Sequence, residues 1–338
     1  MTKNARIMAS LTSTALLACI AAAQDVEGLA PDGSRASTLP QIDRAAGPLV
    51  REIADGLYSV TDGVYVTMFL VYGPGEGEDG DGGVIAVDAP PTMGDLTEVI
   101  AGVTDRPITH VVYSHAHTDH IGGAAAYPKD AVRVAHAETA RLLAEVGDPR
   151  RPVPAITFEG AMTLRAGDAV LELAHHGPNH TPGNIFIHAP DHGALMLVDV
   201  VFPGWMPFKN LGIVQDVRGY LDAFDAALAY DFDTFVGGHV AQVGTRADVE
   251  TARDFAYDLR AQAAAALEAL PVAEYAGQAG TRNPWRLYDG YQDAVTERCR
   301  AAIVERWSDR LSGTDVYAAD NCWVMSEAIS VDLAPTAP

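Results

Sequence analysis

The segment His115-Ala116-His117-Thr118-Asp119-His120 restricts the possible folds more strongly than any other part of the chain. It follows the run Ile108 to Tyr113, which is short, largely apolar and rich in β-branched residues, as buried strands are. Residues two apart in an extended segment face the same way, so His115 and His117 can contact one ion together. The aspartate and the last histidine of the segment lie beyond the bend and can contact a second ion. Imidazole and carboxylate groups suit zinc, and so dense a group is costly to assemble without a cation.

Three further candidate ligands stand at the ends of other predicted strands, where loops present functional groups from a rigid scaffold. They are His180 within Asn179-His180-Thr181-Pro182-Gly183-Asn184, Asp199 after Leu195-Met196-Leu197-Val198, and His239 after Phe235-Val236-Gly237-Gly238. We interpret the remaining histidines as structural: His110, His136, His175, His176, His188 and His192. The sequence therefore predicts a metal site assembled from several strand ends.

The order of these motifs resembles the metallo-β-lactamase superfamily, over roughly Leu49 to Val243. The resemblance implies an α/β fold of four layers, an αββα sandwich, with a site for two metal ions at one edge. It implies a ligand role for each of the seven residues: His115, His117 and His180 for the first zinc, Asp119, His120 and His239 for the second, and Asp199 bridging both. Asp88, at the end of the strand Val84 to Val87, resembles the carboxylate that steadies the ligand loop in this family.

The resemblance also implies a metal-dependent hydrolase that uses a metal-bridging hydroxide, with Asp119 as a catalytic group. We expect two Zn²⁺ ions, and other divalent metals, including iron or manganese, are alternatives. Asp199 stands where the β-lactamases of this family carry Cys or Ser, so we expect a small ester, lactone or amide as the substrate. The alternatives are an iron-dependent oxidoreductase similar to the persulfide dioxygenases, a β-lactamase, and a metal-binding protein without catalytic activity.

Substrate contacts are expected from the loop Phe202 to Asn210, which is unusually apolar and aromatic. Trp205 and Phe208 would line one wall of a pocket, and Lys209 would bind an anionic group. The alternative is that this loop packs on the C-terminal part of the chain.

Residues 246–338 show helical periodicity, from Val249 to Leu270, from Trp285 to Leu311 and from Asn321 to Ile329. We predict a helical C-terminal extension that forms a lid, a cap or a homodimer surface. It contains Cys299 and Cys322, an even pair that predicts a disulfide in an exported protein, with two buried thiols as the alternative.

Residues 1–23 have the pattern of a signal peptide: basic residues, an apolar run and then Ala21-Ala22-Ala23. Residues 24–47 read as a flexible lead-in, and residues 48–245 as the metallo-β-lactamase domain. We expect a periplasmic or secreted protein, and Cys19 offers the alternative of a lipoprotein. No apolar stretch is long enough to predict an integral membrane span. The net charge of −22 argues against a nucleic-acid partner and leaves a small molecule as the expected substrate.

Overall fold

The computed structural model describes residue 42 and residues 47–76, 80–240 and 242–333. The predicted signal peptide at 1–23, the possible lipid site at Cys19 and nearly all of the lead-in at 24–47 lie outside the described residues.

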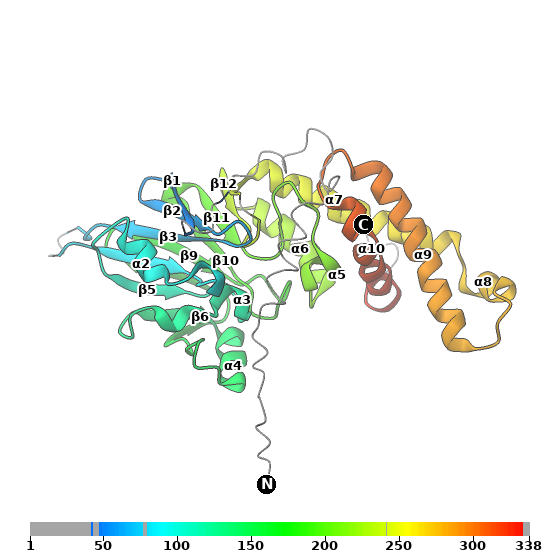
Figure 1. Cartoon of the computed structure of the whole chain (residues 1–338), viewed down its shortest axis with the longest axis horizontal. Helices are drawn as coiled ribbons and strands as arrows, with labels where there is room; N and C mark the ends of the chain where they lie inside the picture. The colour runs from blue at the N-terminus through cyan, green and yellow to red at the C-terminus, as the bar shows by residue number, and fades with distance from the viewer. Residues whose placement is uncertain (1–41, 43–46, 77–79, 241, 334–338) are drawn as a thin grey trace, which may run out of the picture.

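A seven-stranded sheet forms the first half of the sandwich (Figure 1). Strands β1 to β4 pair antiparallel, and β4 to β7 pair parallel. The strands, in spatial order, are β1 (Leu49–Ala54), β2 (Leu57–Thr61), β3 (Val66–Tyr72), β4 (Gly83–Val87), β5 (Ile108–Val112), β6 (Val132–His136) and β7 (Ile156–Phe158). The parallel strand β4 is buried on both faces and reads as a continuous apolar run, whereas β5 is only partly buried at Thr109 and His110.

A six-stranded sheet packs against the first. It is antiparallel except for the parallel pair β11–β12. Its strands, in spatial order, are β13 (Gly244–Thr245), β12 (Thr234–Val236), β11 (Ala194–Leu197), β10 (Phe186–Ala189), β9 (Ala169–Ala174) and β8 (Ala161–Ala166).

Alternating side chains divide the sandwich into its layers. In β3, Met68 and Leu70 join a core with Ile187 and Met196 of the second sheet, whereas Phe69 points to the other side. The outer face of the first sheet packs against short helices: α2 (Leu96–Ala101), α3 (Thr118–Ile121) and α4 (Ala137–Val146). The outer face of the second sheet packs against α6 (Val217–Leu228) and the C-terminal helices. The predicted αββα architecture is confirmed.

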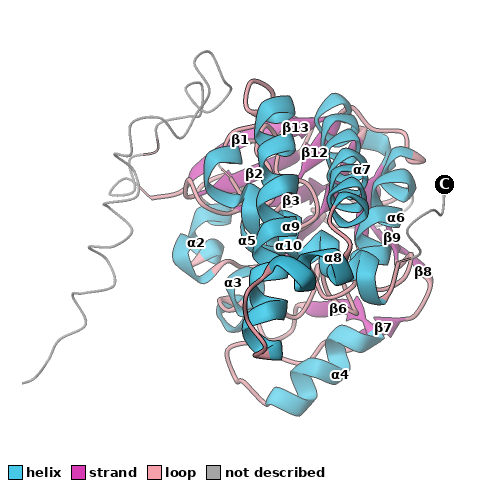
Figure 2. Ribbon diagram, turned by 90° about the vertical axis from the view of Figure 1, so that its right-hand side faces the viewer, coloured by secondary structure: helices cyan, strands magenta, loops and turns pink. Residues whose placement is uncertain are grey.

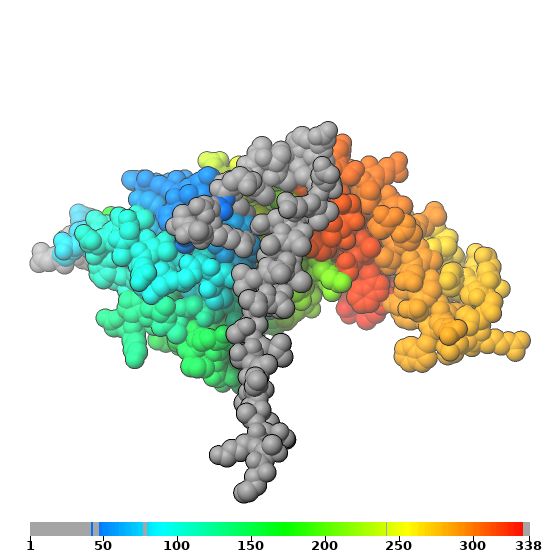
Figure 3. All heavy atoms as spheres, viewed as in Figure 1, coloured from blue at the N-terminus to red at the C-terminus, as the bar shows by residue number. Residues whose placement is uncertain are grey.

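Within the described residues, four helices follow the sandwich and form the layer that faces the viewer in Figure 2. They are α7 (Arg246–Ala269), α8 (Val272–Gln278), α9 (Pro284–Trp307) and α10 (Thr314–Val331). Leu259, Ile303 and Met325 of these helices share one apolar cluster with Phe186 and Phe235 of the second sheet. The helices therefore share a core with the outer face of the second sheet, although α8 and α9 extend away from it as a lobe (Figure 3). The domain boundary at residue 245 stays a prediction.

The helical extension differs from the sequence expectation in two places. Helix α8 was not predicted, because its seven residues are too few to show periodicity. Helix α10 begins at Thr314, seven residues before the predicted start at Asn321. Of the helix residues before Asn321, only Thr314 and Ala318 are buried, and two small side chains give too little apolar periodicity to predict the first turns.

Cys299 and Cys322 form the predicted disulfide, with an S–S distance of 1.98 Å. The bridge joins α9 to α10, and both cysteines are fully buried. None of the helices among the described residues has the length and apolar character that a bilayer span requires.

Removal of this bridge is expected to destabilise the fold. The double variant C299A/C322A should lose about 3 kcal/mol of unfolding free energy, because the closed loop spans 23 positions of sequence. Denaturant titrations of the variant, and of the wild type with and without reductant, measure this loss. Equal midpoints for the oxidised and reduced wild type would contradict the expectation.

Candidate metal centre

The candidate ligands meet at one end of the sandwich, where strands of both sheets finish. Asp88 follows β4, and His115 to His120 follow β5 and enter α3. In the second sheet, Asp199 follows β11 and His239 follows the parallel strand β12. His180 lies in the turn before β10. Each element was predicted separately, and only the packing of the two sheets brings them together.

The first group of donors comprises His115, His117, His180 and Asp199, whose ligand atoms lie within 4.8 Å of one another. His180 Nε2 lies 3.1 Å from His117 Nδ1 and 3.1 Å from Asp199 Oδ2. His115 Nε2 lies 3.5 Å from Asp199 Oδ2. These atoms face a common centre, as ligands of one ion do.

The second group comprises Asp119, His120 and His239, again with ligand atoms within 4.8 Å. Asp199 contacts this group too: His120 Nε2 lies 3.2 Å from Asp199 Oδ2, and His239 Nε2 lies 3.0 Å from Asp199 Oδ1. One buried carboxylate thus lies between the two groups, at the place of the bridging ligand that the resemblance implies. The structure brings all seven candidate ligands together.

Burial and mutual charge determine the protonation of this cluster. Burial opposes ionisation of Asp199, but His120 and His180 hold the pKa of its carboxyl well below the usual range. Burial lowers the pKa of His115 well below its usual range and that of His117 to about 4. Burial also disfavours charge on His120, yet Asp199 outweighs it and raises the pKa of His120 to about 9. The cluster therefore offers neutral imidazoles at His115 and His117 and an ionised carboxylate at Asp199, whereas His120 has to lose a proton before it can bind a cation.

Two observations test whether these residues fit a metal ion. The buried Nε2 of His115 has no hydrogen-bond partner, although it points at other ligand atoms. Asp199 Oδ1 lies close to His239 Nε2 but is not aligned for a hydrogen bond. Buried polar atoms seldom stay unpaired, so their convergence fits a site that a cation completes. A set of nitrogen and carboxylate donors suits zinc and also manganese or iron.

Asp88 orients His115 through Ser114, a residue that the sequence analysis missed. Asp88 Oδ1 accepts a hydrogen bond from the Ser114 N–H at 2.8 Å, and its Oδ2 accepts one from the Ser114 hydroxyl at 2.7 Å. Ser114 Oγ also lies 2.9 Å from His115 Nδ1. Because the hydroxyl hydrogen of Ser114 is engaged in the hydrogen bond to Asp88, His115 Nδ1 must donate to the hydroxyl oxygen, which leaves the lone pair of Nε2 facing the site. Burial raises the pKa of Asp88 to about 6.

Asn184 holds the His180 turn to the strand that ends at Asp199. Its Nδ2 donates to Asn179 Oδ1 at 2.9 Å and to the Val198 carbonyl at 2.8 Å. Asn179 Oδ1 in turn accepts from the His180 N–H at 2.7 Å. The sequence showed Asn184 only as a residue of a turn, and nothing in it indicated this contact between two loops.

Aromatic rings surround His239 on the outer side of the centre. The ring centroid of Tyr65 lies 4.8 Å from that of His239, and those of Phe202 and Phe208 lie 5.9 and 5.5 Å from it. Phe208 was predicted to lie in this wall, whereas Tyr65 was missed because its loop precedes β3, far away in sequence.

The other two predicted pocket residues face the C-terminal helices. Trp205 forms an isolated bridge with Ser312 and lies against Gly313. Lys209 Nζ lies 3.4 Å from Asp320 Oδ1 of α10. Trp205 and Lys209 therefore follow the alternative, in which the loop packs on the C-terminal part of the chain. A role in substrate binding stays a prediction for Trp205, Phe208 and Lys209.

The histidines interpreted as structural lie outside both donor groups. Most have ordinary partners: His136 with the Glu159 carbonyl, His175 with the Pro182 carbonyl, His176 with the Tyr230 hydroxyl and His188 with the Glu172 carboxylate.

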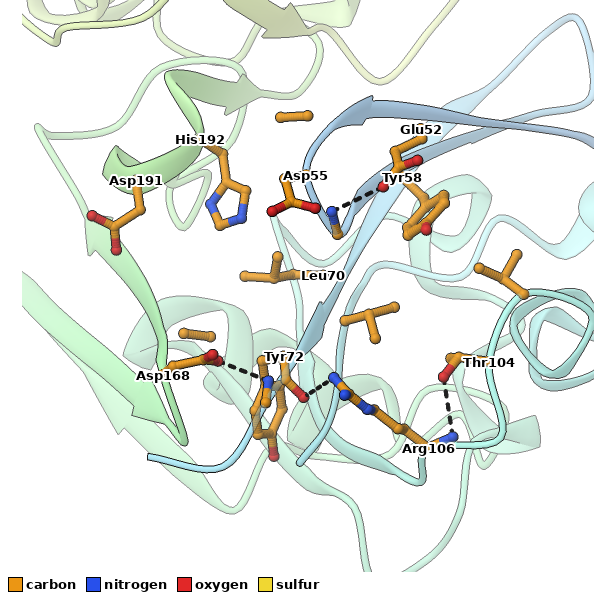
Figure 4. Close-up of a pocket in the computed structure, with 16 residues that line it drawn as sticks. Glu52, Asp55, Tyr58, Leu70, Tyr72, Thr104, Arg106, Asp168, Asp191 and His192 are labelled. Carbon is orange, nitrogen blue, oxygen red and sulfur yellow. Dashed lines mark hydrogen bonds between the residues drawn. The ribbon is translucent and has the colours of Figure 1, made fainter. Parts of the chain in front are cut away.

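A cavity of about 810 Å³ lies at the opposite end of the sandwich (Figure 4). Three of its polar side chains are hydrogen-bonded to nearby backbone: Asp168 Oδ1 accepts from the Gly73 N–H, Glu52 Oε1 accepts from the Gly56 N–H, and Arg106 Nη1 donates to the Tyr72 carbonyl. These hydrogen bonds stabilise the turns that connect strands. The cavity is remote from the metal centre.

Comparison with known proteins agrees with this geometry. A family model described as "Metallo-beta-lactamase superfamily" matches residues 62–239. Among solved structures, a metallo-β-lactamase from Pontibacter korlensis has a TM-score of 0.52 and 20% identity, covering 62% of this chain and 99% of that one. The metallo-β-lactamase FIM-1 from Pseudomonas aeruginosa, in its mono-zinc form, has a TM-score of 0.51 and 20% identity, covering 63% and 96%. At this identity the likeness shows the fold alone.

Three relatives match at higher identity. The 2,4-dinitroanisole O-demethylase subunit alpha of Nocardioides sp. (strain JS1661) is 30% identical over 223 residues, 63% of each protein. A hydroxyacylglutathione hydrolase of Anaeromyxobacter dehalogenans (strain 2CP-C) is 35% identical over 30% of this chain and 34% of its own length. An acyl-coenzyme A thioesterase of Gallus gallus is 30% identical over 32% of this chain and 49% of its own length. The chain spans less than two thirds of the length of each relative.

Metal content after removal of single ligands tests the geometry. We expect about two divalent ions per chain in the wild type, and a loss of both ions in Asp199→Ala, because this carboxylate contacts both donor groups. His176→Ala is the matched control, since His176 is four positions from His180 but exposed and outside both groups. Elemental analysis after dialysis gives the stoichiometry. Full metal content in Asp199→Ala, or equal loss in both variants, would contradict the assignment.

Proposed function

The chain belongs to the metallo-β-lactamase superfamily. From that premise we propose that it is a hydrolase of a small ester, lactone or amide. The enzyme would use two divalent metal ions, and zinc is the metal we expect. The position of Asp199 carries this proposal. It contacts His115 and His180 of one donor group and His120 and His239 of the other. A carboxylate shared in this way suits a pair of adjacent cations.

When bound, a pair of divalent cations would polarise a scissile carbonyl and lower the pKa of water at the site. The side chains of the protein supply the remaining steps. The Asp119 side chain is 42% exposed, whereas that of Asp199 is 2% exposed, so Asp119 lies on the open side of the centre. From there it can orient an attacking water, accept its proton and return a proton to the leaving group. Asp88 and Ser114 keep the His115 ring fixed while this happens.

The names of the relatives widen the range of reactions to test. The names of two relatives refer to acyl thioesters: one is a hydrolase of hydroxyacylglutathione and the other is a thioesterase for acyl-coenzyme A. The relative that matches over 223 residues is an O-demethylase subunit for 2,4-dinitroanisole, which adds cleavage of an aryl ether as a second candidate. The aspartate at 199, where β-lactamases carry Cys or Ser, disfavours β-lactams.

We also propose that the protein is exported to the periplasm or secreted. The pattern at residues 1–23 suggests this, and the disulfide between Cys299 and Cys322 is consistent with an oxidising compartment. The net charge of −22 supports a small-molecule substrate rather than a nucleic acid. A homodimer through the C-terminal helices stays a prediction.

A substrate panel tests the function. Zinc-loaded protein is assayed on lactones, aryl esters, amides, thioesters, phosphodiesters, β-lactams and 2,4-dinitroanisole, with release of acid or phenol as the readout. We expect turnover of an ester or lactone, and a fall in kcat of about 100-fold or more in Asp119→Asn, which removes the proton acceptor. His176→Ala should retain wild-type rates. No hydrolysis by the zinc-loaded protein, together with bound iron and oxygen uptake in protein purified without added metal, would contradict the proposal and favour the oxidoreductase alternative.

A further inference from the structure

The loop from Phe202 to Ile213 contains a left-handed turn beside the metal centre. Asn210, Leu211, Gly212 and Ile213 have φ angles of 56°, 54°, 73° and 62°. Such a conformation is unfavourable for residues with a side chain, and consecutive residues rarely adopt it. It persists only where surrounding contacts hold it, and such contacts concentrate at functional sites.

Asn321 of α10 supplies the contacts that hold this turn. Its Oδ1 accepts a hydrogen bond from the Leu211 N–H at 2.7 Å, and its Nδ2 donates to the Pro207 carbonyl at 2.8 Å. The Asn321 side chain is fully buried, and both of its polar groups form hydrogen bonds to the backbone of the loop. A buried amide within a helix is costly unless it is paired. Its pairing with the backbone of a distant loop therefore indicates a specific task.

The N-terminal half of α10 and the residues just before it are held in place by other contacts. Cys322, the next residue, is bridged to Cys299 of α9. The Ser312 N–H donates to the Gly204 carbonyl, and the Met206 N–H donates to the Ser312 carbonyl, both at 3.1 Å. The loop is therefore attached to the start of α10 as well as to Asn321.

The other side of the loop is attached to the metal centre. Phe208, at the start of the turn, lies against His239. Beyond the turn, the Gln215 N–H donates to the His180 carbonyl and the Asp216 N–H donates to the Asn179 carbonyl, both at 3.1 Å. A Cβ on Gly212 would lie 3.1 Å from Phe202 and 3.4 Å from the Asp199 carbonyl oxygen, so little room is left for movement.

We propose that Asn321 is a positioning residue that holds the loop Phe202–Ile213, so that helix α10 determines which substrates the metal centre accepts. The proposal rests on the hydrolase function proposed above. Asn321 does not touch the donor groups. Its hydrogen bonds hold the backbone at Pro207 and Leu211. Because Phe208 lies between these two residues, its ring is held beside His239, where it forms an apolar wall.

The test compares Asn321→Leu with Ser326→Ala in the full-length protein. Leucine is close to asparagine in size but makes neither hydrogen bond to the loop. Ser326 is the matched control, because it is buried in the same helix and its hydroxyl donates only to carbonyls of that helix, at Cys322 and Trp323. Amide hydrogen exchange should rise at residues 210–214 in Asn321→Leu and stay unchanged there in Ser326→Ala.

Kinetics on two esters with the same leaving group, one with an acetyl group and one with a bulky apolar acyl group, complete the test. Asn321→Leu should change the ratio of the two kcat/KM values by about tenfold or more, mainly through KM, at unchanged metal content. This ratio is independent of the fraction of active protein, so a merely destabilised variant would not shift it. Asn321→Ser, which is too short to span the gap, replaces Asn321→Leu if that variant does not fold.

Exchange at residues 210–214 equal to that of Ser326→Ala, or an unchanged ratio of kcat/KM values, would overturn the proposal. A wild type that hydrolyses no ester would instead contradict the proposed hydrolase function. The exchange comparison would then still decide whether Asn321 holds the loop.

Discussion

The buried carboxylate of Asp199 lies between 3.0 and 3.5 Å from a nitrogen of each of four histidines, and the rest of the structure is arranged around this contact. Those histidines come from the loop after β5, the turn before β10 and the loop after β12, so neither sheet could form the cluster alone. Asp199 adopts a φ of 65°, and its N–H donates to the Gly237 carbonyl of the neighbouring strand. The packed sandwich core holds this strained residue in place, as expected where strain serves a site.

The sequence predicted the fold and the donor set because both depend on local patterns. Short apolar runs mark the strands, and each donor follows such a run or lies in a rigid turn beside one. The metallo-β-lactamase resemblance, confirmed by the family match over residues 62–239, supplied the order of the layers that no single run contains. The disulfide between Cys299 and Cys322 was predicted from their number and from the expected compartment.

What the sequence could not show are contacts between distant segments. The link from Asp88 through Ser114 to His115 depends on β4 and β5 being neighbours, and the link from Asn321 to Leu211 spans 110 positions. The left-handed turn at residues 210–213 was also hidden, because only one of its residues is a glycine. Lys209 was interpreted as an anion-binding group from its loop, but its pairing with Asp320 required the position of α10.

The two-metal assignment is tested most directly by crystals of zinc-loaded protein measured on both sides of the zinc absorption edge. We expect two anomalous peaks, one among His115, His117 and His180 and one among Asp119, His120 and His239, with the Asp199 carboxylate between them. A single peak, or peaks away from Asp199, would contradict it.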